Sequence, residues 1–286
     1  MNLLELDRDL RDCGGVQWLI NHGVFSKEKE CLNCGKRMYL SFNKISYRCS
    51  NKKCRKEISM KKNTVFGKTK LKLEKVIMLM YSFVYGYSTK SIERELKISR
   101  STIAKFKKIF RKLLSVIINE QNQNMIGGDN HIVQIDEMYI GRRKYGRGRS
   151  PAEENQHWYV GGIDTTTKEI FYEMVNNRDN KTLFDVIHRY VRLDSIIYTD
   201  SWRGYNSIDE DYEHYTINHK EGFVNDNVHT QNIEATHNAV RRILRRNGTN
   251  SGNKELQFME YIWIKHQNGN SDLFENFIND LAYLYN

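Results

Sequence analysis

Two acidic residues stand where a metal-dependent reaction could use them. Asp136 lies within "HIVQIDEMYI" (residues 131–140), whose β-branched residues predict a strand, although strands are poor in aspartate. Asp200 ends a second short apolar stretch, "SIIYTD", which also predicts a strand. Carboxylates on adjacent strands repel one another unless cations neutralise them, and these hard oxygen ligands suit Mg²⁺ or Mn²⁺. The pair therefore predicts a divalent metal site.

A third carboxylate would complete such a site, and we expect it on a helix packed against the sheet. The segment "HTQNIEATHNAVRRILRRNG" supplies Glu234. Apolar residues spaced as on one helix face would be buried: Ile233, Val240, Ile243 and Leu244. Glu234 could then point toward the edge of the sheet.

Each acid also has a purely structural interpretation. Asp200 could cap the next helix, Glu234 could be a solvated helix residue, and Asp136 could be a buried, hydrogen-bonded residue. The three in this order on these elements favour the catalytic interpretation. Two neighbouring acids are expected elsewhere: Asp164 in a turn, and Glu137 on the other face of the strand, because strand side chains alternate.

Four of the five cysteines form two pairs, Cys31 and Cys34 in "CLNC", and Cys49 and Cys54 in "CSNKKC". Four thiolates at this spacing can close tetrahedrally around one structural Zn²⁺. The alternative, two disulfides, is disfavoured in the reducing interior of a cell. We therefore expect a zinc ribbon, and Cys13 is assigned no role.

The segment after the cysteines predicts helices. An apolar helix is followed by a break centred on Gly86, by "STKSIEREL" with Ser88 as N-cap, and by a third helix from "SRSTIAKF". This order is typical of a helix-turn-helix, although a plain three-helix bundle has the same apolar pattern. The last helix would present polar and basic side chains near its N-terminus to a DNA groove: Arg100, Ser101, Thr102 and Lys105.

Beyond residues 127–130 the pattern becomes strand-like. "HWYVGGIDTTTKEIFYEMV" predicts two strands joined by a turn at 164–167, and "KTLFDVIHRYVR" predicts a helix. The strand after that helix should run parallel to its neighbour. The sequence therefore predicts a mixed α/β fold.

The composition limits the class of protein. With 45 Lys and Arg against 35 Asp and Glu, the formal charge is +10 and the pI about 9.2, which suits a nucleic-acid partner or a merely basic protein. We find no run of about 18 apolar residues, and the charged start, "MNLLELDRDLRDCGG", does not suit a secretory signal. We expect a globular protein inside the cell, without a membrane partner.

The motifs together resemble a known family. "QIDEMYIG", "TDSWRGYN", and "NHKEGFVN" followed by "HTQNIE", behind a four-cysteine ribbon and a helical region, are similar to transposases of the Merlin superfamily and related bacterial insertion sequences. The resemblance implies an RNase H-like catalytic domain with the triad Asp136, Asp200 and Glu234, and a basic residue two turns later, Arg241. One departure is His237 and Asn238 in place of tryptophan and serine, which bears on the local packing of this helix.

The resemblance also implies the domain order. We expect an N-terminal helical segment (1–25), a zinc ribbon (26–66), a helix-turn-helix-like DNA-binding region (67–126) and an RNase H-like DDE catalytic domain (127–286). Basic residues beside the site are expected to attract a phosphodiester backbone: Arg142, Arg143, Lys144, Arg147, Arg241 and Arg242. The same charges could serve nuclear import, so we expect the nucleus in a eukaryote and the cytoplasm, at the nucleoid, otherwise.

The function implied is metal-dependent DNA cleavage and strand transfer by two-metal phosphodiester transesterification. The cofactors would be two Mg²⁺ or Mn²⁺ ions and a structural Zn²⁺. The partners would be double-stranded DNA, as terminal inverted repeats and target, and at least one more copy of the chain. Two alternatives are a non-catalytic DNA-binding regulator derived from such an enzyme, and an RNase H-type nuclease or resolvase.

Overall fold

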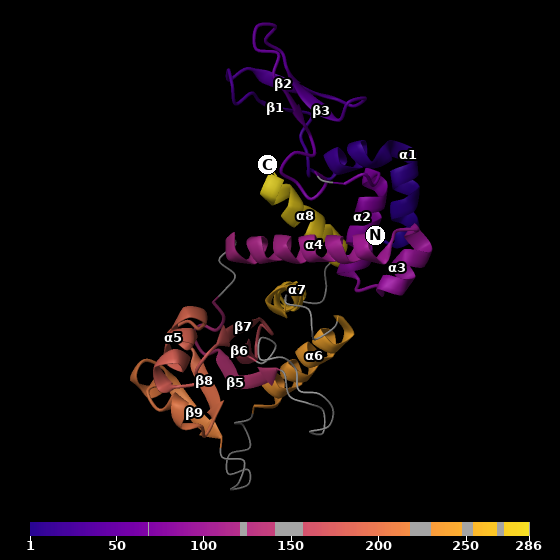
Figure 1. Ribbon diagram of the computed structural model, residues 1–286. Coiled ribbons are helices and arrows are strands. Elements are labelled where there is room, and N and C mark those ends of the chain that lie inside the picture. The colour runs from indigo at the N-terminus through magenta and orange to yellow at the C-terminus, as the bar shows by residue number, and fades with distance from the viewer. Residues whose placement is uncertain are drawn as a thin grey trace. The chain divides into compact units, whose positions relative to one another are not determined.

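The computed structural model describes residues 1–67, 69–120, 125–140, 157–217, 230–247, 254–267 and 272–285. The chain divides into two compact units. The first combines residues 1–113 with residues 270–286, and the second contains residues 114–269 (Figure 1). Each unit is described by itself below.

The first unit begins with helix α1 (Leu3–Asn21), followed by a small antiparallel sheet in the order β1-β2-β3-β4. Its strands are short: β1 (Glu28–Glu30), β2 (Arg37–Ser41), β3 (Ser46–Cys49) and β4 (Glu57–Ser59). This sheet, called the ribbon below, buries few apolar side chains, among them Met38 and Tyr47. Strands of three to five residues with so small a core need a further constraint, such as a metal ion.

Three helices follow the ribbon: α2 (Leu73–Val84), α3 (Thr89–Leu96) and α4 (Arg100–Glu120). Gly86 adopts a φ of 67° after α2, a conformation that glycine tolerates without strain. Ser88 Oγ accepts a hydrogen bond from the N–H of Ser91 at 3.0 Å and so caps α3. The predicted helices, break and cap are confirmed.

Helix α8 (Leu273–Tyr285) completes the core of the first unit. The ring of Phe274 lies 5.2 Å from that of Tyr81, and the ring of Phe277 lies 6.1 Å from that of Phe110. The sequence prediction put residues 127–286 in one catalytic domain, whereas the structure groups residues 270–286 with the first unit. The physical reason is that α8 presents its aromatic face to α2 and α4.

The second unit is built on a five-stranded mixed sheet in the order β7-β6-β5-β8-β9. Strands β5, β6 and β7 are antiparallel neighbours, whereas β8 runs parallel to β5 and β9 runs parallel to β8. The strands are β5 (Ile132–Ile140), β6 (His157–Asp164), β7 (Ile170–Val175), β8 (Ile196–Asp200) and β9 (Glu213–Ile217). The predicted mixed α/β fold is confirmed, and the sheet is RNase H-like.

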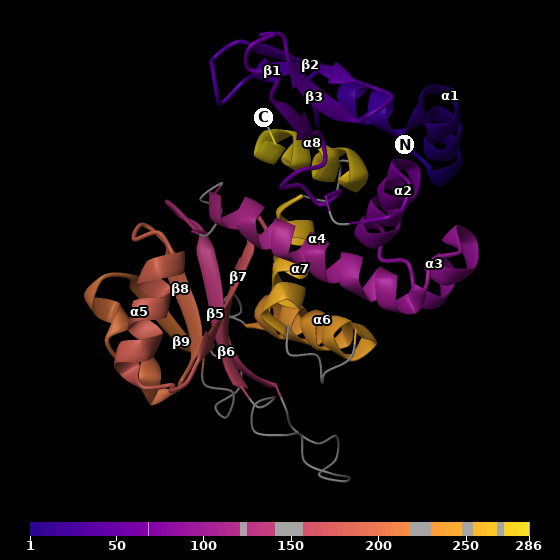
Figure 2. The same ribbon diagram turned by 45° about the horizontal axis from the view of Figure 1, so that its top comes forward.

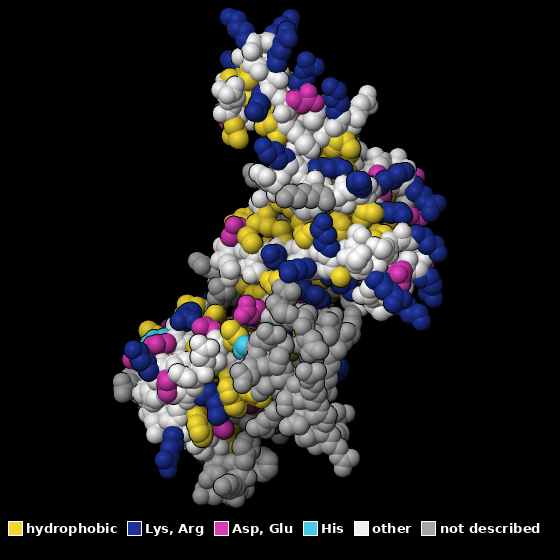
Figure 3. All heavy atoms as spheres, viewed as in Figure 1, with side chains coloured by type: hydrophobic (Ala, Val, Ile, Leu, Met, Phe, Trp, Pro, Cys, Tyr) yellow, Lys and Arg dark blue, Asp and Glu magenta, His cyan; other side chains and the backbone are white. Residues whose placement is uncertain are grey.

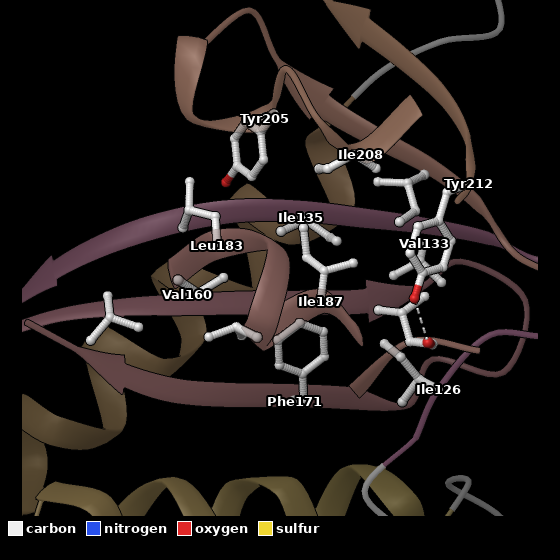
Figure 4. Packing of buried hydrophobic residues seen from close by; sticks show 14 residues of the cluster. Ile126, Val133, Ile135, Val160, Phe171, Leu183, Ile187, Tyr205, Ile208 and Tyr212 are labelled. Atoms are coloured by element: carbon white, nitrogen blue, oxygen red, sulfur yellow. Dashed lines mark hydrogen bonds between the residues drawn. The ribbon is translucent and has the colours of Figure 1, made fainter. Parts of the chain in front are cut away.

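Helices cover both faces of this sheet (Figure 2). On one face α5 (Asn180–Tyr190) buries Leu183 and Ile187 against Val133 and Ile135 of β5, as the close view in Figure 4 shows. On the other face lie α6 (Gln231–Asn247) and α7 (Lys254–His266). Because strand side chains alternate, even-numbered residues of β5 face α6 and odd-numbered ones face α5.

No helix among the described residues is long and apolar enough to span a membrane.

Candidate active site

The pairing of β5 with β8 determines where the two aspartates lie. The parallel register matches Ile132 with Ile196 and Gln134 with Tyr198. Continued by two residues, the same register sets Asp136 beside Asp200. Residues paired in neighbouring strands point to the same face, so both carboxylates lie on the face that α6 covers. The structure therefore brings these two predicted residues together.

Asp136 has one hydrogen-bond donor and one histidine nitrogen close to its carboxylate. The N–H of Glu137 donates to Oδ1 at 2.8 Å, and Nε2 of His237 lies 3.4 Å from Oδ2. The side chain of Asp136 keeps 28% of its exposure, whereas that of His237 keeps 2%. A half-buried carboxylate with these neighbours is held in place and remains accessible to a cation.

A strand residue also positions the helix that carries Glu234. The side-chain Oε1 of Gln134 accepts hydrogen bonds from the N–H groups of Asn232 at 3.0 Å and Ile233 at 3.2 Å. These N–H groups open α6 and have no partner within the helix, so the buried Gln134 acts as its cap. Glu234 follows in the first turn, close to the residue that precedes Asp136 on the same strand face.

Glu234 is exposed, and its Oε1 lies 3.4 Å from the hydroxyl of Thr230. Asp200 also has a local partner, since its Oδ1 accepts the N–H of Trp202 at 3.0 Å. The contact of Glu234 agrees with its structural interpretation as a solvated helix residue. Asp200 does not cap the next helix (Arg203–Tyr205), because Trp202 holds the N-cap position. A carboxylate can accept more than one such hydrogen bond, so neither contact prevents the carboxylate from also binding a metal ion.

Glu137, next to Asp136, lies on the opposite face of β5, as alternation predicts. Its carboxyl is near Tyr205, a member of the apolar cluster under α5 (Figure 4). Burial raises the pKa of Glu137 to about 7, and the negative charges of Asp200 and Asp136 act in the same direction. These carboxylates are therefore close enough to influence one another electrostatically.

The structure does not close the three predicted acids into one compact group. Within the described ranges, the one group of three or more metal-ligating side chains close enough to hold an ion is Cys31, Cys34, Cys49 and Cys54. Asp136 and Asp200 share a face and a register position, whereas Glu234 reaches the same face from α6. Three carboxylates on these elements have the donor chemistry that Mg²⁺ or Mn²⁺ requires.

The four cysteines form a candidate metal centre in the ribbon. Their Sγ atoms all lie within 4.8 Å of one another, with 3.8 Å between Cys31 and Cys54 and 3.5 Å between Cys34 and Cys49. A disulfide needs about 2.05 Å, whereas a tetrahedron with Zn–S bonds of about 2.3 Å has S–S edges of about 3.8 Å. The amide of Asn33 donates to Cys54 Sγ at 3.2 Å and lowers the pKa of that thiol, which favours the thiolate. The spacing fits zinc and is longer than a disulfide bond.

The predicted DNA-contacting residues are placed in part. Arg100 and Lys105 are exposed on α4, and Arg100 pairs with Glu93 at 2.7 Å. Arg242 is exposed on α6, and Arg241 is half-buried two turns after Glu234. The remaining predicted residues lie outside the described residues: Arg142, Arg143, Lys144 and Arg147.

Sequence reasoning missed two contacts of the site. Gln134 was not singled out, although its position two residues before Asp136 puts it on the same strand face. His237 was connected with helix packing, whereas the structure places its Nε2 beside Asp136. The signal for His237 was its spacing of three residues from Glu234, which puts both on neighbouring positions of one helix face.

The chain is similar to known proteins. Residues 126–262 match the model of the ISXO2-like transposase domain. An uncharacterized transposase-like protein from Haemophilus influenzae is 31% identical over 97 residues, which cover 33% of this chain and 79% of that protein.

Solved structures are similar at a distance. The magnesium-bound catalytic core domain of the HTLV-2 integrase aligns at 15% identity over 47% of this chain and 84% of that chain, with a TM-score of 0.31 in its trimeric form. Its dimeric form aligns over 48% of this chain and 87% of that chain, with a TM-score of 0.32. A likeness this distant says nothing of function.

Proposed function

We propose that this chain, which belongs to the ISXO2-like family of bacterial insertion-sequence DDE transposases, binds the ends of a mobile DNA element and catalyses their metal-dependent cleavage and transfer. The observation that carries the proposal is the register of β5 and β8, which sets Asp136 beside Asp200 on the face where α6 brings Glu234. The three acids come from separate chain segments on one side of the sheet and do not form a compact group.

The three carboxylates would hold two Mg²⁺ or Mn²⁺ ions, with Asp136 shared between them. Such ions activate the attacking hydroxyl and neutralise charge on the phosphoryl group and the leaving oxygen. Asp136 and Asp200 sit on strands and need little movement. The exposed side chain of Glu234 has three rotatable bonds and would turn toward the aspartates to complete the site. No raised pKa is needed for these acids, because they act as ligands.

The basic charge that would hold DNA is concentrated in the ribbon. Residues 26–66 contain twelve Lys and Arg and three Glu, which gives a net charge of +9 in a chain whose total is +10. Eleven of the twelve basic residues are exposed, and Figure 3 shows basic side chains over the strands of the ribbon. A zinc-stabilised ribbon of this charge would bind the phosphate backbone of DNA. Helices α3 and α4 would contact the ends of the mobile DNA element.

The experiment uses purified protein, Mn²⁺ or Mg²⁺, and labelled DNA from the two flanks of its open reading frame. Wild type should cut this DNA and join the ends to a target, whereas Asp200→Asn should lose both reactions by a large factor, because an amide is a much weaker ligand than a carboxylate. Asp194→Asn is the matched control, since Asp194 is exposed just before the same strand. It should react as wild type does.

Equal DNA binding by wild type and Asp200→Asn with cleavage by neither would contradict the proposal and favour a DNA-binding regulator. Cleavage of branched DNA without joining to a target would favour a nuclease or resolvase.

A further inference from the structure

His237 is a buried group that the proposed reaction leaves without a role. It lies on α6, three residues after Glu234, and its side chain is 2% exposed. Its Nε2 has no hydrogen-bond partner among the described residues and lies 3.4 Å from Oδ2 of Asp136. A buried polar atom without a partner is costly, so its placement toward a carboxylate calls for an explanation.

The other ring nitrogen of His237 is held firmly. The hydroxyl of Tyr172 lies 2.7 Å from Nδ1, and both side chains are buried. Burial raises the pKa of Tyr172 well above its ordinary value, so the phenol keeps its proton and can donate it to Nδ1. A carboxylate only accepts hydrogen bonds, so the favourable arrangement has the hydrogen of the imidazole on Nε2, facing Asp136.

The sheet provides a place for this contact. Asp136, Gly161 and Tyr172 are paired across β5, β6 and β7 and so share one face. A Cβ on Gly161 would lie 2.4 Å from Cε1 of Tyr172, so the tyrosine ring lies across the glycine. The missing side chain lets Tyr172 lean toward β5 and reach His237 above Asp136.

We propose that His237, held by Tyr172, is a positioning residue that orients the carboxylate of Asp136 for divalent metal binding. The N–H of Glu137 donates to Oδ1 at 2.8 Å, and Nε2 of His237 lies 3.4 Å from Oδ2, where an N–H on Nε2 would set the plane of the carboxylate from the second side. Each oxygen keeps a lone pair for a cation. Hydrogen bonds to metal ligands of this kind determine the orientation of the ligand and the affinity for the metal.

The inference rests on the proposed function, since it assumes that Asp136 binds a metal ion. The test measures Mn²⁺ binding by calorimetry on the full chain, with the cysteines loaded with Zn²⁺ beforehand. His237→Phe should weaken Mn²⁺ binding by about 10- to 100-fold. His237→Gln, whose amide can place a donor near the position of Nε2, should restore most of the affinity. Tyr172→Phe should lie between wild type and His237→Phe.

Controls separate positioning from folding. His188→Phe removes another histidine–carboxylate pair, that of His188 with Asp211 at 2.8 Å, from α5 on the opposite face of the sheet, and should leave Mn²⁺ binding unchanged. Melting temperatures without Mn²⁺ report folding. If His237→Phe does not fold, Tyr172→Phe carries the test, because it removes one hydroxyl and keeps the ring.

Folded His237→Phe and Tyr172→Phe proteins with wild-type Mn²⁺ affinity would overturn the inference, as would a glutamine variant no better than the phenylalanine one. Asp200→Asn tells the two proposals apart. If it binds Mn²⁺ as wild type does, the proposed function itself fails. If it loses Mn²⁺ binding while the His237 and Tyr172 variants keep it, this inference alone fails.

Discussion

Asp164 and Asp136, on neighbouring strands, differ in burial and in the number of hydrogen bonds that their carboxylates accept. Asp164, at the end of β6, is fully buried, and its oxygens accept from the N–H groups of Thr166 and Thr167 and lie 2.7 Å from Nδ1 of His131. Asp136 is half-buried and keeps free acceptor capacity. Asp164 is the last residue of β6 rather than a residue of the turn, and its side chain binds the N–H groups of the turn, so its role is structural as expected.

Asp164→Asn should destabilise the second unit by about 1–3 kcal/mol near neutral pH. Burial alone would raise the pKa of Asp164, but His131 and the turn N–H groups together lower it below its ordinary value. A lowered folded-state pKa stabilises the fold above the unfolded-state pKa of about 3.9, and this stabilisation is lost as the pH falls through the folded-state value. The loss caused by the substitution should therefore shrink below about pH 4.

Urea unfolding followed by tryptophan fluorescence checks this, since three of the four tryptophans, Trp158, Trp202 and Trp263, lie in the second unit. Asp194→Asn serves as the control with an exposed aspartate. If Asp164→Asn lowers the free energy of unfolding by the same amount at pH 7 and pH 3, the structural role assigned to the Asp164 carboxylate is contradicted.

At the scale of elements, local patterns predicted much of the second unit. Apolar alternation and turn residues were enough to predict β5, β6, β7, α5 and β8, and the parallel pairing of β8. Strand β9 was not predicted, because "EHYTI" is short and mostly polar and gains its strand pairing from β8. The contact of Tyr172 with His237 depends on Gly161, which pairs with Asp136 on the neighbouring strand, and no local pattern reveals it.

The ribbon should depend on its metal ion. Its four strands bury too little apolar surface to be stable alone, so Cys34→Ser should lose the bound zinc and the fold of the ribbon. Elemental analysis should find about one zinc per chain in wild type and much less in this variant. Cys13→Ser, outside the cluster, should keep the zinc. Full zinc content in Cys34→Ser would contradict the assignment.

At the scale of the whole molecule, the first unit is assembled from two distant parts of the chain. Rings of α8 pack on α2 and α4, and the hydroxyl of Tyr285 accepts the N–H of Val65 at 3.0 Å. The sequence could not reveal this, because an amphipathic helix after residue 270 shows which face it buries and not what it is buried against.

Phe277→Ala should destabilise the first unit by about 3–5 kcal/mol, because Phe277 is fully buried among the rings of Phe83 and Phe110. Tyr283→Ala is the matched control, since Tyr283 is 62% exposed on the same helix. Thermal unfolding of the full chain checks both, with hydrogen exchange of α2 amides reporting the first unit. Equal effects of the two substitutions would contradict the assigned role of α8.

The shared core of α2, α4 and α8 has a consequence for synthesis on the ribosome. Domains usually fold in the order in which they emerge, starting from the N-terminus. Here residues 114–269 emerge before α8 does, whereas the unit that contains residues 1–113 lacks part of its core until residues 273–285 emerge. The second unit can therefore fold without α8, whereas the basic ribbon and its helices gain their full stability only once α8 has emerged.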